Sequence, residues 1–216
     1  MEKWYDVYIK QIEKNGGNKD YMKLKISQKK KLLKIIKNNS GDGNFIEAGC
    51  GTGIMCSQLA HEGYCVTGVD IDGNILELAS KLEKEYFGEN KVKFEEKSIF
   101  KLDYEEKAFD LCYSVGVLEH FSDEEIINSV RQQLKIAQKV IIVIPTKWFD
   151  DNEALHGDDR FLSLPYWRKL INKSGGNVVK EYSYPFKGKG VSLLTRIKKM
   201  FRPRAYRIFL IEKNNR

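Results

Sequence analysis

The stretch that decides the fold is residues 45–53, Phe-Ile-Glu-Ala-Gly-Cys-Gly-Thr-Gly. Apolar residues end a strand-like segment, glycines follow at alternate positions, and residues 54–62 then continue with helical spacing. Glycines allow a tight turn and let a ligand approach the backbone closely. The N-terminus of the helix that follows offers unpaired N–H groups to an anionic group. The pattern therefore predicts a strand, a ligand-binding turn and a helix.

A carboxylate stands at the end of the next predicted strand. Asp70 closes the segment Val66-Thr67-Gly68-Val69-Asp70, roughly 20 residues beyond the glycine turn. A carboxylate in this position can accept hydrogen bonds from both hydroxyls of a ribose. The turn and Asp70 together predict a nucleoside-containing ligand.

The glycine turn departs from the fingerprint of dinucleotide-binding enzymes. That fingerprint, counted from Gly49, requires a sixth residue that is glycine, and the sixth residue here is Ile54. Glu47 would also repel a pyrophosphate, whereas it suits a ligand that carries an ammonium group. A nicotinamide-dependent dehydrogenase is therefore disfavoured.

Strands and helices are expected to alternate along most of the chain. Near-continuous apolar strands between amphipathic helices indicate an α/β fold with a parallel sheet covered on both faces. The pattern changes after Pro145, where a helix and two strands suggest an antiparallel hairpin at the sheet edge. The expected strands are 45–48, 65–70, 92–97, 109–114, 139–144, 177–184 and 206–212, and the helices include 54–62, one near 75–86, one that Asp123 caps and that runs to Ile136, and 165–173.

Residues 1–43 precede this alternation and are expected to be helical. A short helix over 3–14 is followed by a break at 15–18, and Ser27 is expected to cap a helix that runs to Asn39. We expect 1–43 to form a lid and a first packing helix, and 44–216 to form the main domain. Trp4, Tyr5 and Tyr8 would then close a pocket, or serve packing alone.

Four segments together resemble the class I S-adenosylmethionine-dependent methyltransferases, within the branch of ubiquinone-biosynthesis-type small-molecule enzymes. The resemblance covers residues 44–146. It implies a Rossmann-like, seven-stranded, mostly parallel sheet with helices on both faces and an antiparallel edge strand. It also implies S-adenosylmethionine as the cofactor and S-adenosylhomocysteine as its product. The segments that carry it are 47–53, 68–71, 109–114 and 117–121.

The resemblance also implies roles for single residues around the cofactor. Ser98 stands where the family commonly has an aspartate for the adenine amino group, and a hydroxyl is a weaker, neutral acceptor. Backbone groups at Ile99 could take over that contact. The implied cofactor-binding residues are Gly49, Gly51 and Gly53 at the methionine part, Glu47 near its ammonium, Asp70 at the ribose, Ile71 and Ser98–Ile99 at the adenine, and Ser114 and Val115 through backbone atoms.

Two histidines are candidates for catalysis. Methyl transfer from a sulfonium needs no dedicated base, although a base helps when the acceptor is a hydroxyl or a protonated amine. His120 follows the fourth strand and His156 follows the fifth, and each is either a base or a histidine with a structural or solvated role. His61 is expected at the surface. Arg160 is expected to clamp an anionic substrate group or to pair with a neighbouring aspartate.

No metal is expected. A catechol-type metal site needs acids after the fourth and fifth strands, and the segment Asp150-Asp151-Asn152 could supply only the second set.

Composition sets the remaining bounds. Of 216 residues, 42% are hydrophobic and 31% charged, as in soluble globular proteins. The sequence has no apolar stretch long enough to span a membrane and no apolar leader, and its four scattered cysteines are typical of reduced thiols. A cytoplasmic location is expected.

The net charge of +7 is concentrated near the C-terminus. The insert 185–204 carries basic and apolar residues at helical spacing, which suits an anionic surface or a helix that closes the acceptor pocket. The expected function is methyl transfer to a small-molecule acceptor. The alternatives are a methyltransferase of RNA or protein, and a non-catalytic S-adenosylmethionine-binding protein, which only Ser98 favours.

Overall fold

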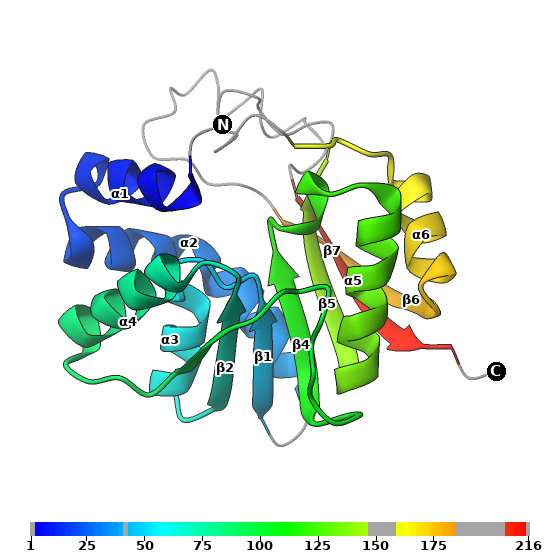
Figure 1. The fold of residues 1–216 in the computed structure, drawn as a ribbon, viewed down its shortest axis with the longest axis horizontal. Coiled ribbons are helices and arrows are strands. Elements are labelled where there is room, and N and C mark those ends of the chain that lie inside the picture. Colours follow the sequence, from blue (N-terminus) through cyan, green and yellow to red (C-terminus); the bar gives the residue numbers. More distant parts are fainter. Residues whose placement is uncertain (1–2, 41–42, 147–158, 185–205, 215–216) are drawn as a thin grey trace.

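The computed structural model describes residues 3–40, 43–146, 159–184 and 206–214. These residues form one seven-stranded sheet in the order β3-β2-β1-β4-β5-β7-β6 (Figure 1). The first five strands pair in parallel, and β7 is antiparallel to both of its neighbours. The strands are β1 (Asn44–Ala48), β2 (Cys65–Asp70), β3 (Lys93–Glu96), β4 (Phe109–Val115), β5 (Ala137–Pro145), β6 (Gly176–Tyr184) and β7 (Tyr206–Lys213).

This arrangement confirms the predicted fold class. The antiparallel strand β7 lies between β5 and β6, so β6 forms the edge of the sheet. Crossover helices connect β1 to β2, β2 to β3 and β4 to β5, as the alternating pattern predicts, whereas β3 and β4 are joined by a segment without a helix. The helices are α1 (Trp4–Lys14), α2 (Asn18–Asn38), α3 (Ile54–His61), α4 (Gly73–Phe87), α5 (Asp123–Ile136) and α6 (Leu164–Lys173), with a short 3-10 helix, η1 (Leu118–His120), after β4.

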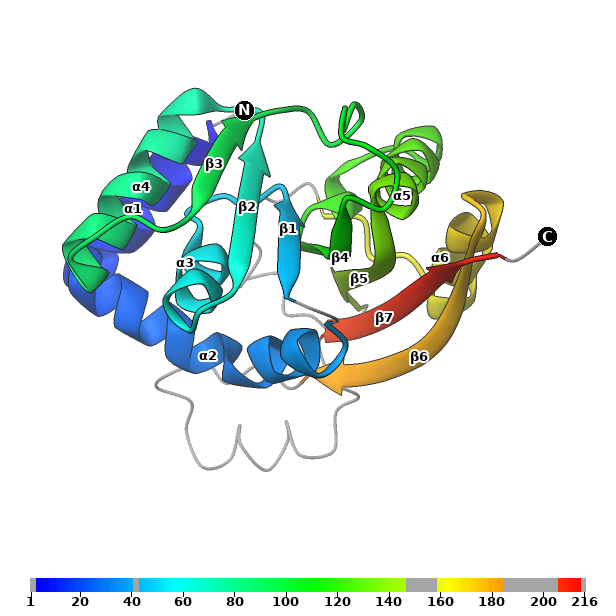
Figure 2. The same ribbon diagram turned by 90° about the horizontal axis from the view of Figure 1, so that it is seen from below.

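Successive strand residues face opposite sides of the sheet and build two cores. Phe45 and Leu111 join the cluster under α2, α3 and α4, whereas Ile46 and Cys112 join the cluster under α5 and α6. Figure 2 shows these two helix layers on opposite sides of the sheet. Because both faces of the sheet are covered, the central strands β1, β4 and β5 are mostly apolar and buried, which explains the sequence pattern.

The N-terminal helices differ from the prediction in one respect. The expected cap at Ser27 is wrong, because α2 begins at Asn18 and its N-cap is Gly17 with φ +91°. Ser27 lies inside the helix, and its hydroxyl donates to the Leu24 carbonyl at 2.7 Å. A serine inside a helix can satisfy its hydroxyl on the preceding turn in this way.

Helix α1 lies at the side of the sheet to which the arrowheads of β1, β2 and β4 point (Figure 1). Its buried Ile12 packs with Tyr21 and Met22 of α2 and with Leu78 and Leu82 of α4. The N-terminal segment therefore has a hydrophobic cluster of its own, which fixes α1 beside the carboxyl ends of the strands.

The start of α5 also corrects a prediction. Its N-cap is Ser122, whose hydroxyl accepts from the Glu125 backbone N–H, while the Glu125 carboxylate accepts from the Ser122 N–H at 2.9 Å. Asp123, the expected cap, is the first helical residue. This reciprocal capping box fixes where the chain leaves η1 and enters α5.

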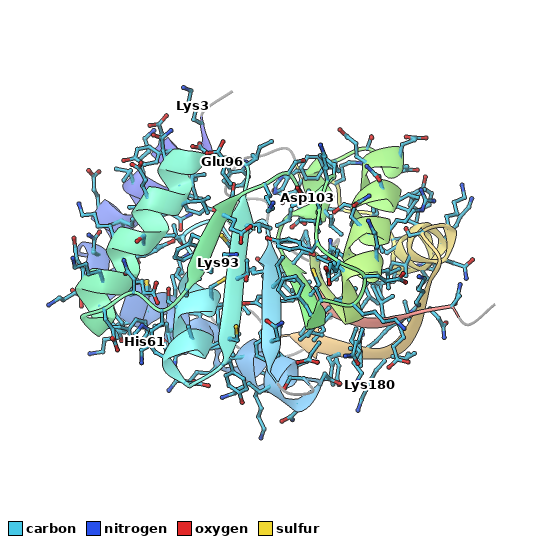
Figure 3. All side chains as sticks on the ribbon, turned by 60° about the horizontal axis from the view of Figure 1, so that its bottom comes forward. Lys3, His61, Lys93, Glu96, Asp103 and Lys180 are labelled. Atoms are coloured by element: carbon cyan, nitrogen blue, oxygen red, sulfur yellow. The ribbon has the colours of Figure 1, made fainter. Side chains whose placement is uncertain are left out.

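His61 is not the surface residue that the sequence predicts. Its side chain is only 10% exposed, its ring stacks on Phe87 at a centroid distance of 4.0 Å, and its Nε2 lies 3.1 Å from the buried Glu83 carboxylate. Figure 3 shows His61 in the layer formed by α3 and α4. The partners of His61 come from the next crossover helix, so local spacing does not reveal them.

Candidate cofactor and acceptor site

The glycine turn has the backbone that its sequence predicts. Gly49, Gly51 and Gly53 all have positive φ, at +74°, +51° and +64°. A Cβ at Gly51 would lie 2.5 Å from the hydroxyl of Tyr8 in α1. Glycine is therefore required here by conformation and by space. The turn lies where β1 ends and α3 begins, at the carboxyl edge of the sheet.

Asp70 joins the turn to the end of β2. Its Oδ2 accepts from the Gly51 backbone N–H at 2.9 Å, and its Oδ1 accepts from the Asp72 N–H at 3.4 Å. Burial raises the pKa of this carboxyl above its ordinary value, and the backbone hydrogen bonds oppose that rise. Asp70 is thus held at the position where a nucleoside-binding carboxylate is expected.

Glu47 is a carboxyl buried inside β1, with 5% of its surface exposed. The Cys56 thiol donates to its Oε2 at 2.9 Å. Burial raises the pKa of Glu47 to about 7, against the opposing effects of Cys56, Lys29 and Tyr113. The carboxyl is therefore close to half ionised near neutral pH.

A pocket of about 180 Å³ opens above the turn. It brings together four of the predicted cofactor-binding and catalytic residues, Glu47, Gly49, Val115 and His120. Its other lining residues are Trp4, Tyr8, Gln11, Tyr21, Lys25, Lys29, Cys50, Thr52, Ile54, Met55, Gly116, Glu119, Asp159 and Tyr206.

Several predicted contacts lie outside this pocket. Ile71 follows Asp70 directly and is 71% exposed, as an apolar cover over a bound ring would be. The Ser98 hydroxyl accepts from the Phe100 N–H at 3.2 Å, and Ile99 is buried in the core. Ser114 is buried within β4. His156, the segment 150–152 and the insert 185–204 lie outside the described residues.

Two lysines of α2 line the pocket, and the sequence prediction missed both. Lys25 and Lys29 stand one helical turn apart. Burial lowers the pKa of Lys25 to about 8 and also lowers that of Lys29, while the Glu47 and Glu119 carboxylates favour the charged form of Lys29. The only available signal was their four-residue spacing, which is hidden in a lysine-rich helix.

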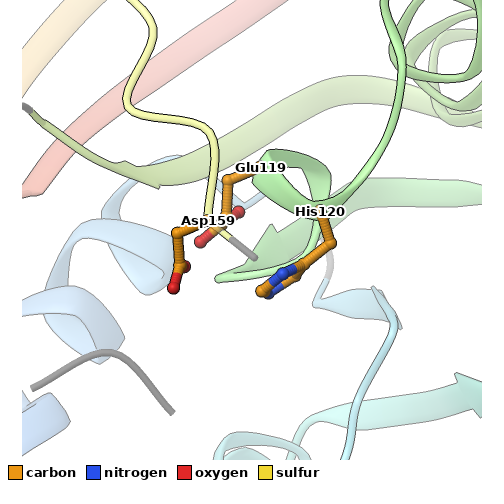
Figure 4. Close-up of side chains that lie close together, drawn as sticks. All are labelled: Glu119, His120 and Asp159. Atoms are coloured by element: carbon orange, nitrogen blue, oxygen red, sulfur yellow. The ribbon is translucent and has the colours of Figure 1, made fainter. Parts of the chain in front are cut away.

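Glu119, His120 and Asp159 form a cluster on the other wall (Figure 4). One potential ligand atom from each lies within 4.8 Å of the others, and Glu119 is buried with 2% exposure. Glu119 and His120 come from η1, directly after β4. The expectation that no acid follows the fourth strand is therefore wrong. The absence of a metal remains a prediction.

Arg160 holds the segment that carries Asp159 against η1. Its backbone N–H donates to the Glu119 carbonyl at 2.9 Å, its guanidinium donates to the Phe121 carbonyl, and a second guanidinium nitrogen lies 2.7 Å from the Asp123 carboxylate. The Arg160 guanidinium thus forms an ion pair with Asp123 of α5, whereas Asp158, one of the expected partners, lies outside the described residues. Arg160 fixes the position of Asp159 at the pocket.

Aromatic side chains of α1 complete the wall. Trp4 and Tyr8 both line the pocket, and the Trp4 ring meets the His120 ring at 5.2 Å with the planes 73° apart. Burial raises the pKa of the Tyr8 hydroxyl well above its ordinary value. Tyr5 and Tyr8 both pack on the hydrophobic cluster between α1, α2 and α4, but Tyr5 does not line the pocket.

Comparison with known proteins agrees with this geometry. Residues 45–137 match the family model described as a methyltransferase domain. Ajmaline N-methyltransferase of Rauvolfia serpentina is 28% identical over 103 residues, which are 47% of this chain and 34% of that protein. The chloroplastic magnesium protoporphyrin IX methyltransferase of Arabidopsis thaliana is 26% identical over 149 residues, which are 66% of this chain and 46% of that protein.

The crystal structure of magnesium protoporphyrin IX methyltransferase from Synechocystis PCC 6803 has the same fold. The superposition gives a TM-score of 0.65 at 16% identity and covers 91% of this chain and 86% of that one. Residues 45–137 therefore resemble a methyltransferase domain, and the chain shares its fold with the Synechocystis enzyme. The chain's matched segment spans about a third of the length of the plant N-methyltransferase.

Proposed function

We propose that the protein transfers the methyl group of S-adenosylmethionine to a small-molecule acceptor. The observation that carries the proposal is the joint placement of Glu47, the left-handed glycine turn and Asp70 at the carboxyl edge of the sheet, beside a pocket. The methyltransferase domain match and the fold support it.

The residues around the turn fit this cofactor chemically. The buried Glu47 suits the ammonium group of the methionine part, and the pocket lysines Lys25 and Lys29 suit its carboxylate. Asp70 suits the ribose hydroxyls, and the exposed Ile71 suits one face of the adenine. A Cβ at Gly49 would lie 2.8 Å from Val117, so the turn leaves room only for backbone.

The bound cofactor would supply an activated methyl group on a positively charged sulfur. The protein then has to position the acceptor, exclude water and take up a proton where the acceptor releases one. His120 lines the pocket and suits the last task. Trp4 and Tyr8 of α1 suit water exclusion, which supports the predicted lid role of the N-terminal segment.

The test is equilibrium binding of S-adenosylhomocysteine, followed by methyl transfer from labelled S-adenosylmethionine. Asp70→Asn should weaken cofactor binding at least about tenfold, because hydrogen bonds to a charged group contribute about 1.5–3 kcal/mol each. Asp103→Asn is the matched control, since Asp103 pairs with Lys97 on an exposed loop. Equal affinity in Asp70→Asn and Asp103→Asn would refute the cofactor assignment.

Two further expectations belong to this proposal. A cytoplasmic location is supported by the free thiols of Cys50, Cys56, Cys65 and Cys112. Contact of the 185–204 insert with an anionic surface stays a prediction, to be measured by sedimentation with anionic vesicles at low and physiological salt. Within the described residues, no helix has the length and apolar character needed to cross a membrane.

A further inference from the structure

One wall of the pocket is acidic and close to the glycine turn. Glu119 and Asp159 lie with His120 at the end of β4, and the nearby Val117 side chain faces Gly49. Glu119 is buried, so a carboxylate here interacts strongly with any charge that enters the pocket. Lys25 and Lys29 reach the pocket from α2 and are suited to the carboxylate of the cofactor.

We propose that the methyl acceptor is a protonatable amine, which Glu119 and Asp159 hold while His120 receives its proton. This inference rests on the proposed function and names the substrate class of the same site. The inference is based on the position of Glu119, His120 and Asp159 in one cluster, because two carboxylates close together favour a bound cationic group.

The charge balance of the reaction favours an amine over a hydroxyl. An ammonium acceptor first gives one proton to the imidazole of His120. The nitrogen lone pair then forms the new N–CH₃ bond, while the S–CH₃ bond breaks and its electron pair stays on sulfur. The positive charge thus moves from sulfur to nitrogen, where Glu119 and Asp159 stabilise it as it develops. A phenolate or alkoxide acceptor would instead be repelled by the same carboxylates.

The aromatic wall suits the same class of acceptor. Trp4 stands beside His120, and Tyr8 lines the pocket with it. Aromatic rings attract cations through their electron-rich faces and shield them from water. An organic cation with an apolar body could therefore contact the aromatic rings on one side and the carboxylates of Glu119 and Asp159 on the other.

The test compares amines with alcohols of the same shape in the complex with S-adenosylhomocysteine. Benzylamine, phenethylamine and tryptamine are each titrated by calorimetry against the corresponding alcohol at pH 7.5. At least one amine should bind about tenfold more tightly than its alcohol, and Glu119→Gln or Asp159→Asn should remove most of that preference. Glu77→Gln on the exposed face of α4 is the matched control and should keep it.

Each other outcome overturns the inference. Equal or weaker binding of every amine shows that the cluster does not select a cationic acceptor. Saturable binding of Mn²⁺ that Glu119→Gln abolishes and the amines do not displace assigns the cluster to a metal ion instead. Failure of S-adenosylhomocysteine itself to bind is a failure of the proposed function, and it is measured first and separately.

Discussion

The proposed contact between the buried Glu47 and the cofactor's ammonium group predicts that cofactor binding depends on pH. Burial raises the pKa of this carboxyl from 4.5 to about 7, so below neutral pH the group carries a proton in the free protein. The proposed contact with the cofactor's ammonium group requires the Glu47 carboxylate, and an α-ammonium group stays protonated below pH 7. Binding should therefore release a proton from Glu47, and cofactor affinity should fall as the pH falls.

The size of the effect follows from the two pKa values. If the cofactor returns Glu47 to its ordinary pKa of 4.5, affinity at pH 5.5 should be roughly fifteenfold weaker than at pH 7.0. About 0.9 proton should be released for each cofactor bound at pH 6.0. The same shift makes the unliganded protein lose stability as the pH rises from 4.5 toward 7, because the folded state binds the proton more tightly than the unfolded chain.

The assay is calorimetric titration with S-adenosylhomocysteine at pH 6.0 in two buffers of different ionisation enthalpy, with affinities measured from pH 5.5 to 7.0. Glu47→Gln should bind more weakly at pH 7.0 and should lose both the pH dependence and the proton release. Glu77→Gln, at an exposed position of α4, should retain both. A wild-type protein with constant affinity over this range and no proton release would show that Glu47 does not meet the ammonium.

Further substitutions test the site and the elements that position it. Gly51→Ala should lower the free energy of unfolding by about 1–2 kcal/mol through the left-handed backbone alone. The added Cβ also clashes with the Tyr8 hydroxyl, and Tyr8→Ala removes that clash. In a double-mutant cycle followed by thermal unfolding, the loss of stability in the double mutant should therefore be smaller than the sum of the two separate losses. Ser122→Ala should cost about 1 kcal/mol of stability through the lost cap and leave cofactor affinity unchanged. Trp4→Ala should lower turnover at unchanged cofactor affinity, because Trp4 lines the pocket. Tyr5→Ala should lower the free energy of unfolding more than it lowers turnover, because Tyr5 packs on the hydrophobic cluster. Equal turnover in Trp4→Ala and the wild-type protein would contradict the lid role.

The placement of the glycine turn, Glu47 and Asp70 at one edge of the sheet could be predicted because its determinants are local. The glycines, Glu47 and the following helix are neighbours in sequence, and Asp70 ends the strand that pairs directly with β1. The fold class followed from the same regularity, since the alternation of apolar strands and amphipathic helices leaves few topologies. The order of the strands, with β7 between β5 and β6, depends on pairing across the sheet.

Two of the errors, at Ser27 and His61, have their physical origin in long-range contacts. Ser27 has the chemistry of a cap, but packing of Tyr21 and Met22 against α1 and α4 extends α2 to an earlier start. The local sequence predicts that His61 lies at the surface, but in the folded chain Phe87 and Glu83 of α4 pack against it. In both places tertiary contacts override a correct local preference.

The wall of the pocket on the proposed acceptor side could not be derived from sequence spacing, because segments far apart in the chain form it. For the same reason its residues can change independently of the cofactor side. This wall is assembled from α1, from η1 and from the segment that Arg160 ties to Glu119 and Asp123. None of these segments belongs to the glycine turn or to the Asp70 strand end, which hold themselves together by their own backbone hydrogen bonds. Changes at Asp159 or Trp4 should therefore alter the choice of acceptor without loss of the cofactor. The affinity of the Asp159→Asn variant for S-adenosylhomocysteine tests this separation directly. A large loss of that affinity would show that the acceptor side and the cofactor side of the pocket are energetically coupled.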